Sequence, residues 1–282
     1  MSTKFKCRLT VSVASANPTL ATAKCFDATY RDSRASPIEE FLRRLESINL
    51  LVPPPAKFNS LQAQLVLLGV IAAVESYFRA IFRRLIFLDE TSAQSVHEKD
   101  VPYAAAMYLS KQLLPEAILE KTTFVSKKTI EDAIRELLGV KGNLPPDLTL
   151  AIQDYVRVCQ LRHCAVHRFG KLGARNAIAL GLSDHSSLLE KPLRLDYAAL
   201  QDVIAIATGM VKVLNNFLFN EILSRVPGGQ WTGAYTSDRR VFLKYYNIFC
   251  DRVSANRTAK PEQLYLQFMR QYSTWAALEA RK

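Results

Sequence analysis

Residues 60–88 read SLQAQLVLLGVIAAVESYFRAIFRRLIFL, and this stretch decides the fold class. Apolar residues recur at helical spacing to about Leu88, and Asn59 or Ser60 is suited to cap the first turn. Over residues 65–74 the segment is apolar on every side, which predicts deep burial in a helical core. That run has ten residues, too few to cross a bilayer, so we expect no membrane span.

The same helical spacing appears on both sides of this segment. It predicts helices over residues 37–50, 103–120 with a break at Pro115, 126–139, 147–169, 196–226, 236–252 and 261–280. Residues 89–100 and 171–194 are typical of irregular connections. Partial alternation of Phe5, Leu9, Val11 and Val13 with polar residues suggests one short strand. We therefore expect a mainly α protein.

Two breaks divide the chain, at Pro53-Pro54-Pro55 and at Pro227-Gly228-Gly229, because proline and glycine interrupt helices. We expect an N-terminal extension over residues 1–55, with the short strand and one helix. Residues 56–226 would form the main helical domain. Residues 227–282 would form a C-terminal helical extension.

Composition and charge restrict the classes of partner and compartment. The formal net charge is +11, which favours a polyanionic partner such as RNA. Residues 155–183 hold five Lys or Arg and no acid, so the charge is locally concentrated. The five cysteines are an odd number without tight pairing, and the first residues lack a secretory pattern. We expect a cytoplasmic protein.

The stretch that carries chemistry is Leu161-Arg162-His163-Cys164-Ala165-Val166-His167-Arg168-Phe169-Gly170. His163 and His167 are four residues apart, so they fall on one face of the predicted helix, and Arg162 lies beside them. Histidine can move protons near neutral pH, and arginine can hold a phosphate and neutralise charge in the transition state. This set suits cleavage of an RNA phosphodiester, because the 2′-hydroxyl supplies the nucleophile.

The motif resembles the signature of the HEPN superfamily, in which an arginine, a polar residue and three variable residues precede a histidine. The resemblance covers roughly residues 60–222 and includes an acid on the preceding long helix, here Glu75 in Val74-Glu75-Ser76-Tyr77-Phe78. It implies a HEPN-like helical bundle with a metal-independent endoribonuclease site and no cofactor. It also implies a homodimer with a composite active site, a toxin or antiviral-defence role, and an antitoxin or regulatory partner.

The resemblance assigns roles by position. Arg162 would hold the scissile phosphate, His167 would transfer protons, and His163 would orient the site. Glu75 would be a supporting residue. In one HEPN subgroup the motif extends to a tyrosine two residues past the histidine, and that tyrosine is a modification target. This chain has Phe169 at that position, so we do not expect control by modification of a tyrosine.

Three basic residues flank the histidines and are candidates for RNA contact: Arg168, Lys171 and Arg175. A simple surface role is nearly as well supported for them. A zinc site from Cys159, His163 and His167 is disfavoured, because ligands at those positions span about 12 Å of straight helix. The alternative function is a catalytically silent HEPN-like module that binds RNA, nucleotide or a partner protein.

Overall fold

The computed structural model describes residues 6–279, and that part of the chain is helical and contains no strand. The mainly α fold class is therefore confirmed. The chain divides into two compact units, one that ends at Arg34 and one that begins at Ala35.

The first unit has little regular structure. Its only helical element within residues 6–34 is a short 3-10 helix, η1 (Thr22–Cys25). The strand predicted near Leu9 to Val13 is wrong: these residues have no strand partner, and Leu9, Val11 and Val13 are 82–95% exposed. A strand is stable only when a neighbour pairs with its backbone. Phe5 lies outside the described residues.

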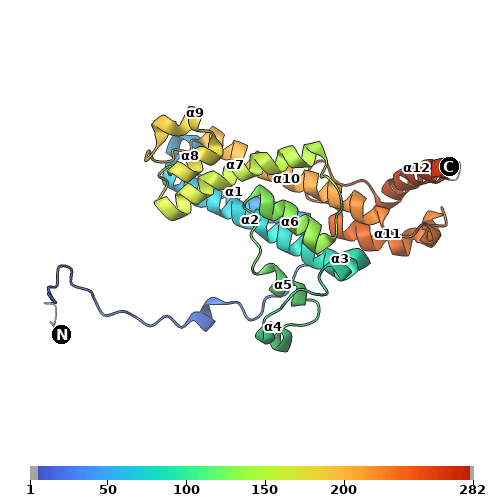
Figure 1. The fold of residues 1–282 in the computed structure, drawn as a ribbon, viewed down its shortest axis with the longest axis horizontal. Helices are drawn as coiled ribbons and strands as arrows, with labels where there is room; N and C mark the ends of the chain where they lie inside the picture. The colour runs from blue at the N-terminus through green and yellow to red at the C-terminus, as the bar shows by residue number, and fades with distance from the viewer. Residues whose placement is uncertain (1–5, 280–282) are drawn as a thin grey trace, which may run out of the picture. The chain divides into compact units, whose positions relative to one another are not determined.

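Four helices form the core bundle of the second unit: α1 (Pro37–Asn49), α2 (Ser60–Leu88), α7 (Pro146–Arg168) and α10 (Tyr197–Ser224). α1 packs on α2, α2 on α7, α7 on α10 and α10 on α1, so the four close on one another (Figure 1). The predicted helices at these positions are confirmed.

Local capping explains where most of these helices begin. The Asn59 side chain accepts hydrogen bonds from the Leu61 and Gln62 N–H groups, as the sequence suggested. Asp196 caps α10 by accepting from Ala199 N–H at 2.8 Å. α7 begins at Pro146, one residue before the start predicted at residue 147, because proline is suited to the first position of a helix, and Asp147 lies in its first turn.

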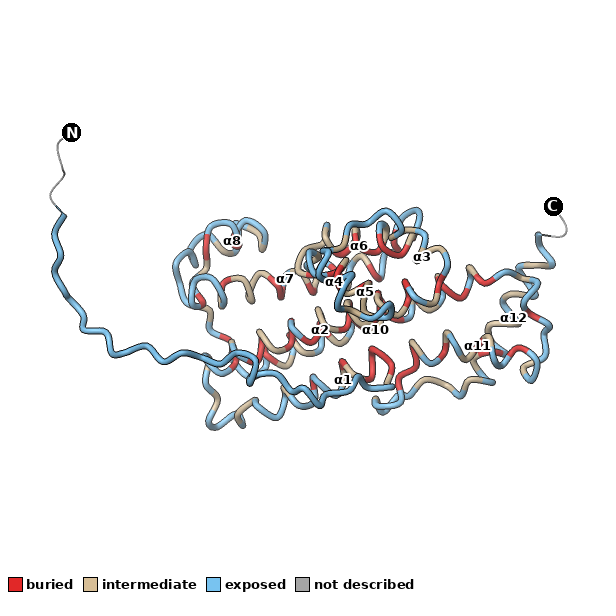
Figure 2. Tube along the Cα trace, turned by 90° about the horizontal axis from the view of Figure 1, so that it is seen from below, coloured by how far each residue is buried: buried red, intermediate tan, exposed pale blue. Residues whose placement is uncertain are grey.

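The bundle core is built from the inner faces of these helices, whose buried positions appear in red in Figure 2. α2 and α10 are also long and apolar enough, by length and composition, to cross a membrane. This is weak evidence, because a core helix passes the same test. Thirteen residues of α2 and ten of α10 are buried within the protein, and the most apolar stretch of α2 is 56% buried, that of α10 33%.

Short helices occupy segments that periodicity describes poorly. Residues 89–100, expected to be irregular, contain α3 (Glu90–Ser95), and the expected helix over 103–120 is two helices, α4 (Tyr103–Tyr108) and α5 (Leu114–Leu119). Pro115 lies in the first turn of α5 rather than inside a longer helix. The irregular connection expected over 171–194 contains α8 (Ala174–Leu180) and α9 (Leu182–His185). α6 (Lys127–Leu138) follows its prediction, with Gly139 as a left-handed cap at φ 62°.

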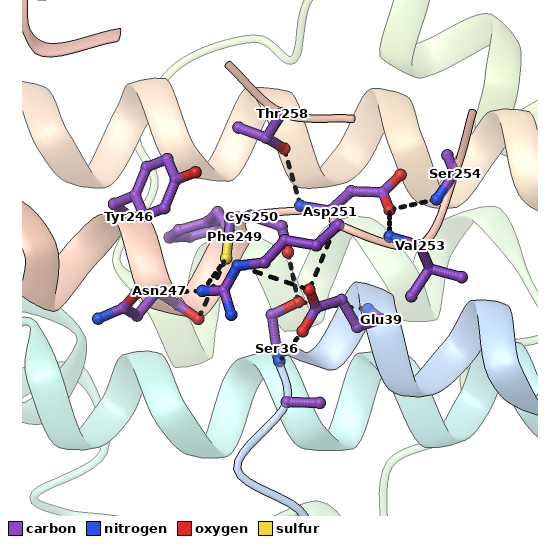
Figure 3. Close-up of polar contacts among 12 residues, drawn as sticks. Ser36, Glu39, Tyr246, Asn247, Phe249, Cys250, Asp251, Val253, Ser254 and Thr258 are labelled. Atoms are coloured by element: carbon purple, nitrogen blue, oxygen red, sulfur yellow. Dashed lines mark hydrogen bonds and ion pairs between the residues drawn. The ribbon is translucent and has the colours of Figure 1, made fainter. Parts of the chain in front are cut away.

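The boundary of the helical unit differs from the predicted break at residue 55, because α1 is part of the bundle. Figure 3 shows Ser36 and Glu39, at the start of α1, directed toward the loop around Cys250. Ser36 Oγ donates to the Cys250 carbonyl at 2.5 Å, and Arg252 N–H donates to Glu39 Oε1 at 3.1 Å. Glu39 is 2% exposed, so these bonds lie in the interior.

The C-terminal helices α11 (Tyr235–Phe249) and α12 (Pro261–Glu279) form as predicted. They add a second apolar cluster at the end of α10, centred on Trp231, Phe242 and Tyr265. Asp238, on α11, links the loop at Thr232 to α12, because its carboxylate accepts hydrogen bonds from the Thr232 N–H and from the Tyr265 hydroxyl.

Candidate functional site

The candidate site lies at the C-terminal end of α7, where a left-handed turn stops the helix. Phe169 has φ 50° and Gly170 has φ 88°, and the Gly170 N–H donates to the Cys164 carbonyl at 3.0 Å. A side chain at Gly170 would place its Cβ 2.9 Å from Gln64 Oε1. The turn therefore brings the end of α7 directly against the first turns of α2.

The structure brings His163 and His167 together on one helix face. Their ring centroids are 4.5 Å apart, and the rings are tilted by 48°. His163 is half-buried, whereas His167 is exposed. The pair therefore has one imidazole against the protein and one open to a ligand.

The pKa of His163 is lowered from its ordinary value. The largest cause is burial, and the charges of His167, Arg175 and Arg162 act in the same direction. The neutral imidazole of His163 is therefore favoured more than in a free histidine. It can accept a hydrogen bond or a proton without first losing one.

Arg162 shares an electrostatic environment with residues of two helices. The positive charge of Arg162 lowers the pKa of Tyr155 and of Cys159. The negative charge of Glu75, on α2, raises the pKa of the same two groups. Glu75 is half-buried and accepts from Phe124 N–H at 3.5 Å. Within residues 6–279, no hydrogen bond or ion pair is formed by the Arg162 guanidinium. Arg162 is thus a cation near Glu75 but not neutralised by direct contact.

Tyr155 is a site neighbour that the sequence reasoning missed. Its hydroxyl is buried, and the Cys159 thiol lies beside it and affects its pKa both by charge and by a side-chain hydrogen bond. Burial raises its pKa and raises that of Cys159 to about 12, so both groups stay protonated. The spacing of Tyr155, Cys159 and Arg162 on one helix face was the signal available in the sequence.

The three flanking cations have different environments. Arg168 forms an ion pair with Glu190, so part of its charge is compensated. Lys171 forms an isolated backbone bridge with Pro192, and its side chain is exposed. Arg175 lies in the first turn of α8, and its charge lowers the pKa of His163. Of the three, Arg175 is the one whose charge contributes to that lowering.

Exposed apolar side chains surround the end of α7. Phe169 is 81% exposed, Val166 45%, and Ile178 on α8 64%. Leu61 and Leu65, at the start of α2, are 48% and 61% exposed. Large apolar side chains left exposed near one another in the chain fold are candidates for contact with a partner.

Comparison with known proteins adds no assignment: no family model, curated protein or solved structure matches the chain. Over residues 6–279, no group of three or more His, Cys, Asp or Glu side chains is placed to hold a metal ion. The site is therefore interpreted from its own geometry.

Proposed function

We propose that this chain is a metal-independent endoribonuclease of the HEPN type. The observation that carries the proposal is the pair of imidazoles 4.5 Å apart beside Arg162, a cation without a direct acidic partner in the described residues. This combination provides proton transfer and phosphate binding in one place. Arg175 adds a second positive charge at the same end of α7.

The reaction would be an intramolecular transesterification. The 2′-oxygen of one nucleotide attacks the adjacent phosphorus, its proton passes to a general base, and the bond to the 5′-oxygen breaks as that oxygen receives a proton. The products are a 2′,3′-cyclic phosphate and a 5′-hydroxyl. His167, the exposed imidazole, would transfer protons, neutral His163 would orient it, and Arg162 would hold the phosphate oxygens. Glu75 would position the Arg162 end of the site.

The proposal includes a homodimer with a composite site. In a single chain His167 is exposed on an open helix face, so one copy supplies one exposed proton-transfer group. A second copy would supply the other. The apolar side chains Phe169, Val166 and Leu65 surround this face, and their burial would favour association of two such faces.

We further propose a cytoplasmic toxin or defence effector. All five cysteines are free, which suits a reducing compartment. An unrestrained ribonuclease would damage its own cell, so an antitoxin or regulatory partner is part of this proposal.

The test is incubation of purified wild type, Arg162→Ala and His167→Ala with mixed RNA in EDTA. We expect cleavage by the wild type and a loss of at least about a hundredfold in each variant. The matched control is His97→Ala, since His97 is an exposed histidine remote in sequence from the site and its replacement should leave the rate unchanged. Failure of the folded dimeric wild type to cleave would favour the silent binding module instead.

A further inference from the structure

A second site is formed by the C-terminal helices, away from the histidines in sequence and structure. A cavity of about 500 Å³ lies between the end of α10, the turn at residues 227–231 and α12. Four of its nine lining residues are aromatic: Trp231, Phe268, Tyr272 and Trp275. The volume is in the range of small-molecule binding sites.

The aromatic rings form a continuous series. Trp231 and Phe268 meet edge to face at 5.1 Å between centroids, Phe268 and Tyr272 stack at 6.0 Å, and Tyr272 lies 5.8 Å from Trp275. Trp231 is buried, whereas Trp275 is 56% exposed. The series therefore runs from the interior to the surface and leaves the outer end open.

One glycine sets the position of Tyr272. A Cβ atom built at Gly228 would overlap the Tyr272 hydroxyl, whereas one built at the neighbouring Gly229 would meet no atom within 4 Å. Both glycines lie in the same 3-10 turn, η4 (Gly228–Gln230). The ring of Tyr272 can take its place in the wall because residue 228 has no side chain.

The polar groups of the cavity are neutral. Asn220, Ser224 and Gln271 line it, and none of its lining residues is an acid or a base. Carboxamides both donate and accept hydrogen bonds. The indole N–H of Trp231 is also buried without a hydrogen-bond partner among the described residues, so a ligand acceptor that reached it would satisfy an unpaired donor.

We propose that this cavity binds a nucleobase. A base has an aromatic face that stacks on Trp, Tyr and Phe, and an edge that alternates donors and acceptors, which matches the carboxamides of Asn220 and Gln271. An ammonium ligand would find no carboxylate in the lining, and a phosphate or carboxylate would find no cation. The base belongs either to a free nucleotide or to an unpaired nucleotide of RNA, with its phosphate outside the cavity.

The chain provides a specific reporter for this site. It contains only two tryptophans, and both Trp231 and Trp275 line the cavity. Tryptophan emission from the full-length protein therefore reports on this cavity alone. Isothermal titration calorimetry gives an independent measure of the same binding.

The experiment titrates the full-length chain with adenosine, guanosine, cytidine and uridine, which carry no phosphate. We expect saturable binding of at least one nucleoside, with affinity weakened about tenfold or more by Gly228→Ala and by Gln271→Ala. Gly229→Ala is the matched control, because it adds the same methyl group in the same turn without a contact. The Gly229→Ala variant should bind the nucleoside with the same affinity as the wild type.

A second arm separates the two sources of the base. A short single-stranded 2′-O-methyl oligonucleotide, which cannot be cleaved through its 2′-oxygen, is titrated in the same way. Affinity equal to that of the nucleoside indicates a free nucleotide, whereas much tighter binding that Gly228→Ala weakens indicates an unpaired nucleotide of RNA.

The proposal is overturned if no nucleoside binds saturably, or if Gly228→Ala and Gly229→Ala bind equally well. It is also overturned if tetramethylammonium or a proline-rich peptide binds here and nucleosides do not. Because the readout is binding and not cleavage, either result leaves the ribonuclease proposal to be judged by its own test.

Discussion

Gly170 and Gln64 meet where the end of α7 contacts the start of α2, and a side chain at residue 170 would require the Gln64 carboxamide to move. A Cβ there would lie 2.9 Å from Gln64 Oε1, and the backbone has φ 88°. The same contact holds the end of α7, which carries the two histidines, against the start of α2. The geometry of the candidate site therefore depends on a glycine that is not itself reactive.

We predict that Gly170→Ala destabilises the protein by about 3 kcal/mol, measured by chemical unfolding. Gly142→Ala is the matched control, because Gly142 also has a positive φ, 78°, but nothing lies within 4 Å of its built Cβ. It should cost only the backbone strain, about 1–2 kcal/mol. Equal losses in the two variants would show that the Gln64 contact does not constrain residue 170.

The lowered pKa of His163 predicts a pH dependence with a definite sign. Because the folded protein favours the neutral imidazole, the unfolded chain binds more protons at mildly acidic pH, so stability falls as the pH drops below about 6.5. The imidazole carbon-bound proton of His163, followed by NMR, should titrate below that of a free histidine.

Burial is the largest cause of the lowered pKa of His163, and the positive charges of its neighbours are the second cause. We therefore expect His167→Ala or Arg175→Ala to move the titration of His163 upward, toward the ordinary value. His97→Ala is the control and should leave it in place. A titration of His163 that neither neighbour affects would contradict the proximity of these groups.

The ion pair between Arg225 and Asp89 should be a strong contributor to stability. The Arg225 guanidinium lies 2.7 Å from Asp89 Oδ2 and 2.8 Å from the Leu138 carbonyl, and the two side chains are 15% and 8% exposed. We expect Arg225→Ala to lower the free energy of unfolding by about 3 kcal/mol, because it leaves a buried carboxylate without its partner.

The exposed pair of Lys99 and Glu136 is the matched comparison. Its side chains are 38% and 61% exposed, and exposed pairs contribute less than about 1 kcal/mol. Lys99→Ala should therefore change the unfolding midpoint in urea very little. The expectation is contradicted if Lys99→Ala lowers the free energy of unfolding more than Arg225→Ala does.

The dimer proposal predicts a difference between two equally exposed residues of α2. Leu65, beside the candidate site, is 61% exposed, and Phe87, at the far end of the helix, is 62% exposed. Leu65→Asp should shift sedimentation from dimer to monomer and abolish cleavage, whereas Phe87→Asp should leave both unchanged. A wild type that sediments as a monomer at cleavage-competent concentration would contradict the composite site.

The long helices of the bundle could be predicted from the sequence, because periodicity and caps agree over many turns. Asn59 and Asp196 cap α2 and α10 as their residue types indicate. The short helices α3 and α8 could not be predicted from the sequence. They have too few residues to show a helical repeat of apolar positions, and they depend on contacts with residues distant in sequence. α3, for example, is capped by Asp89, whose carboxylate also accepts from Arg225.

The site was predictable in part for the same reason. The shared face of His163 and His167 follows from helical spacing alone. The ion pair of Arg168 with Glu190 and the approach of Glu75 to Tyr155 depend on how separate segments pack. Local sequence carries no signal for that packing.

The most direct measurement is the chemistry of the product ends. A short RNA with one cleavage site is incubated with the wild type in EDTA, beside the same RNA carrying a 2′-deoxy nucleotide at that site, and the products are identified by mass spectrometry. We predict a 2′,3′-cyclic phosphate or 3′-phosphate with a 5′-hydroxyl from the all-ribose substrate, and no cleavage of the 2′-deoxy substrate. Cleavage of both substrates, or products with a 5′-phosphate, would contradict attack by the 2′-hydroxyl.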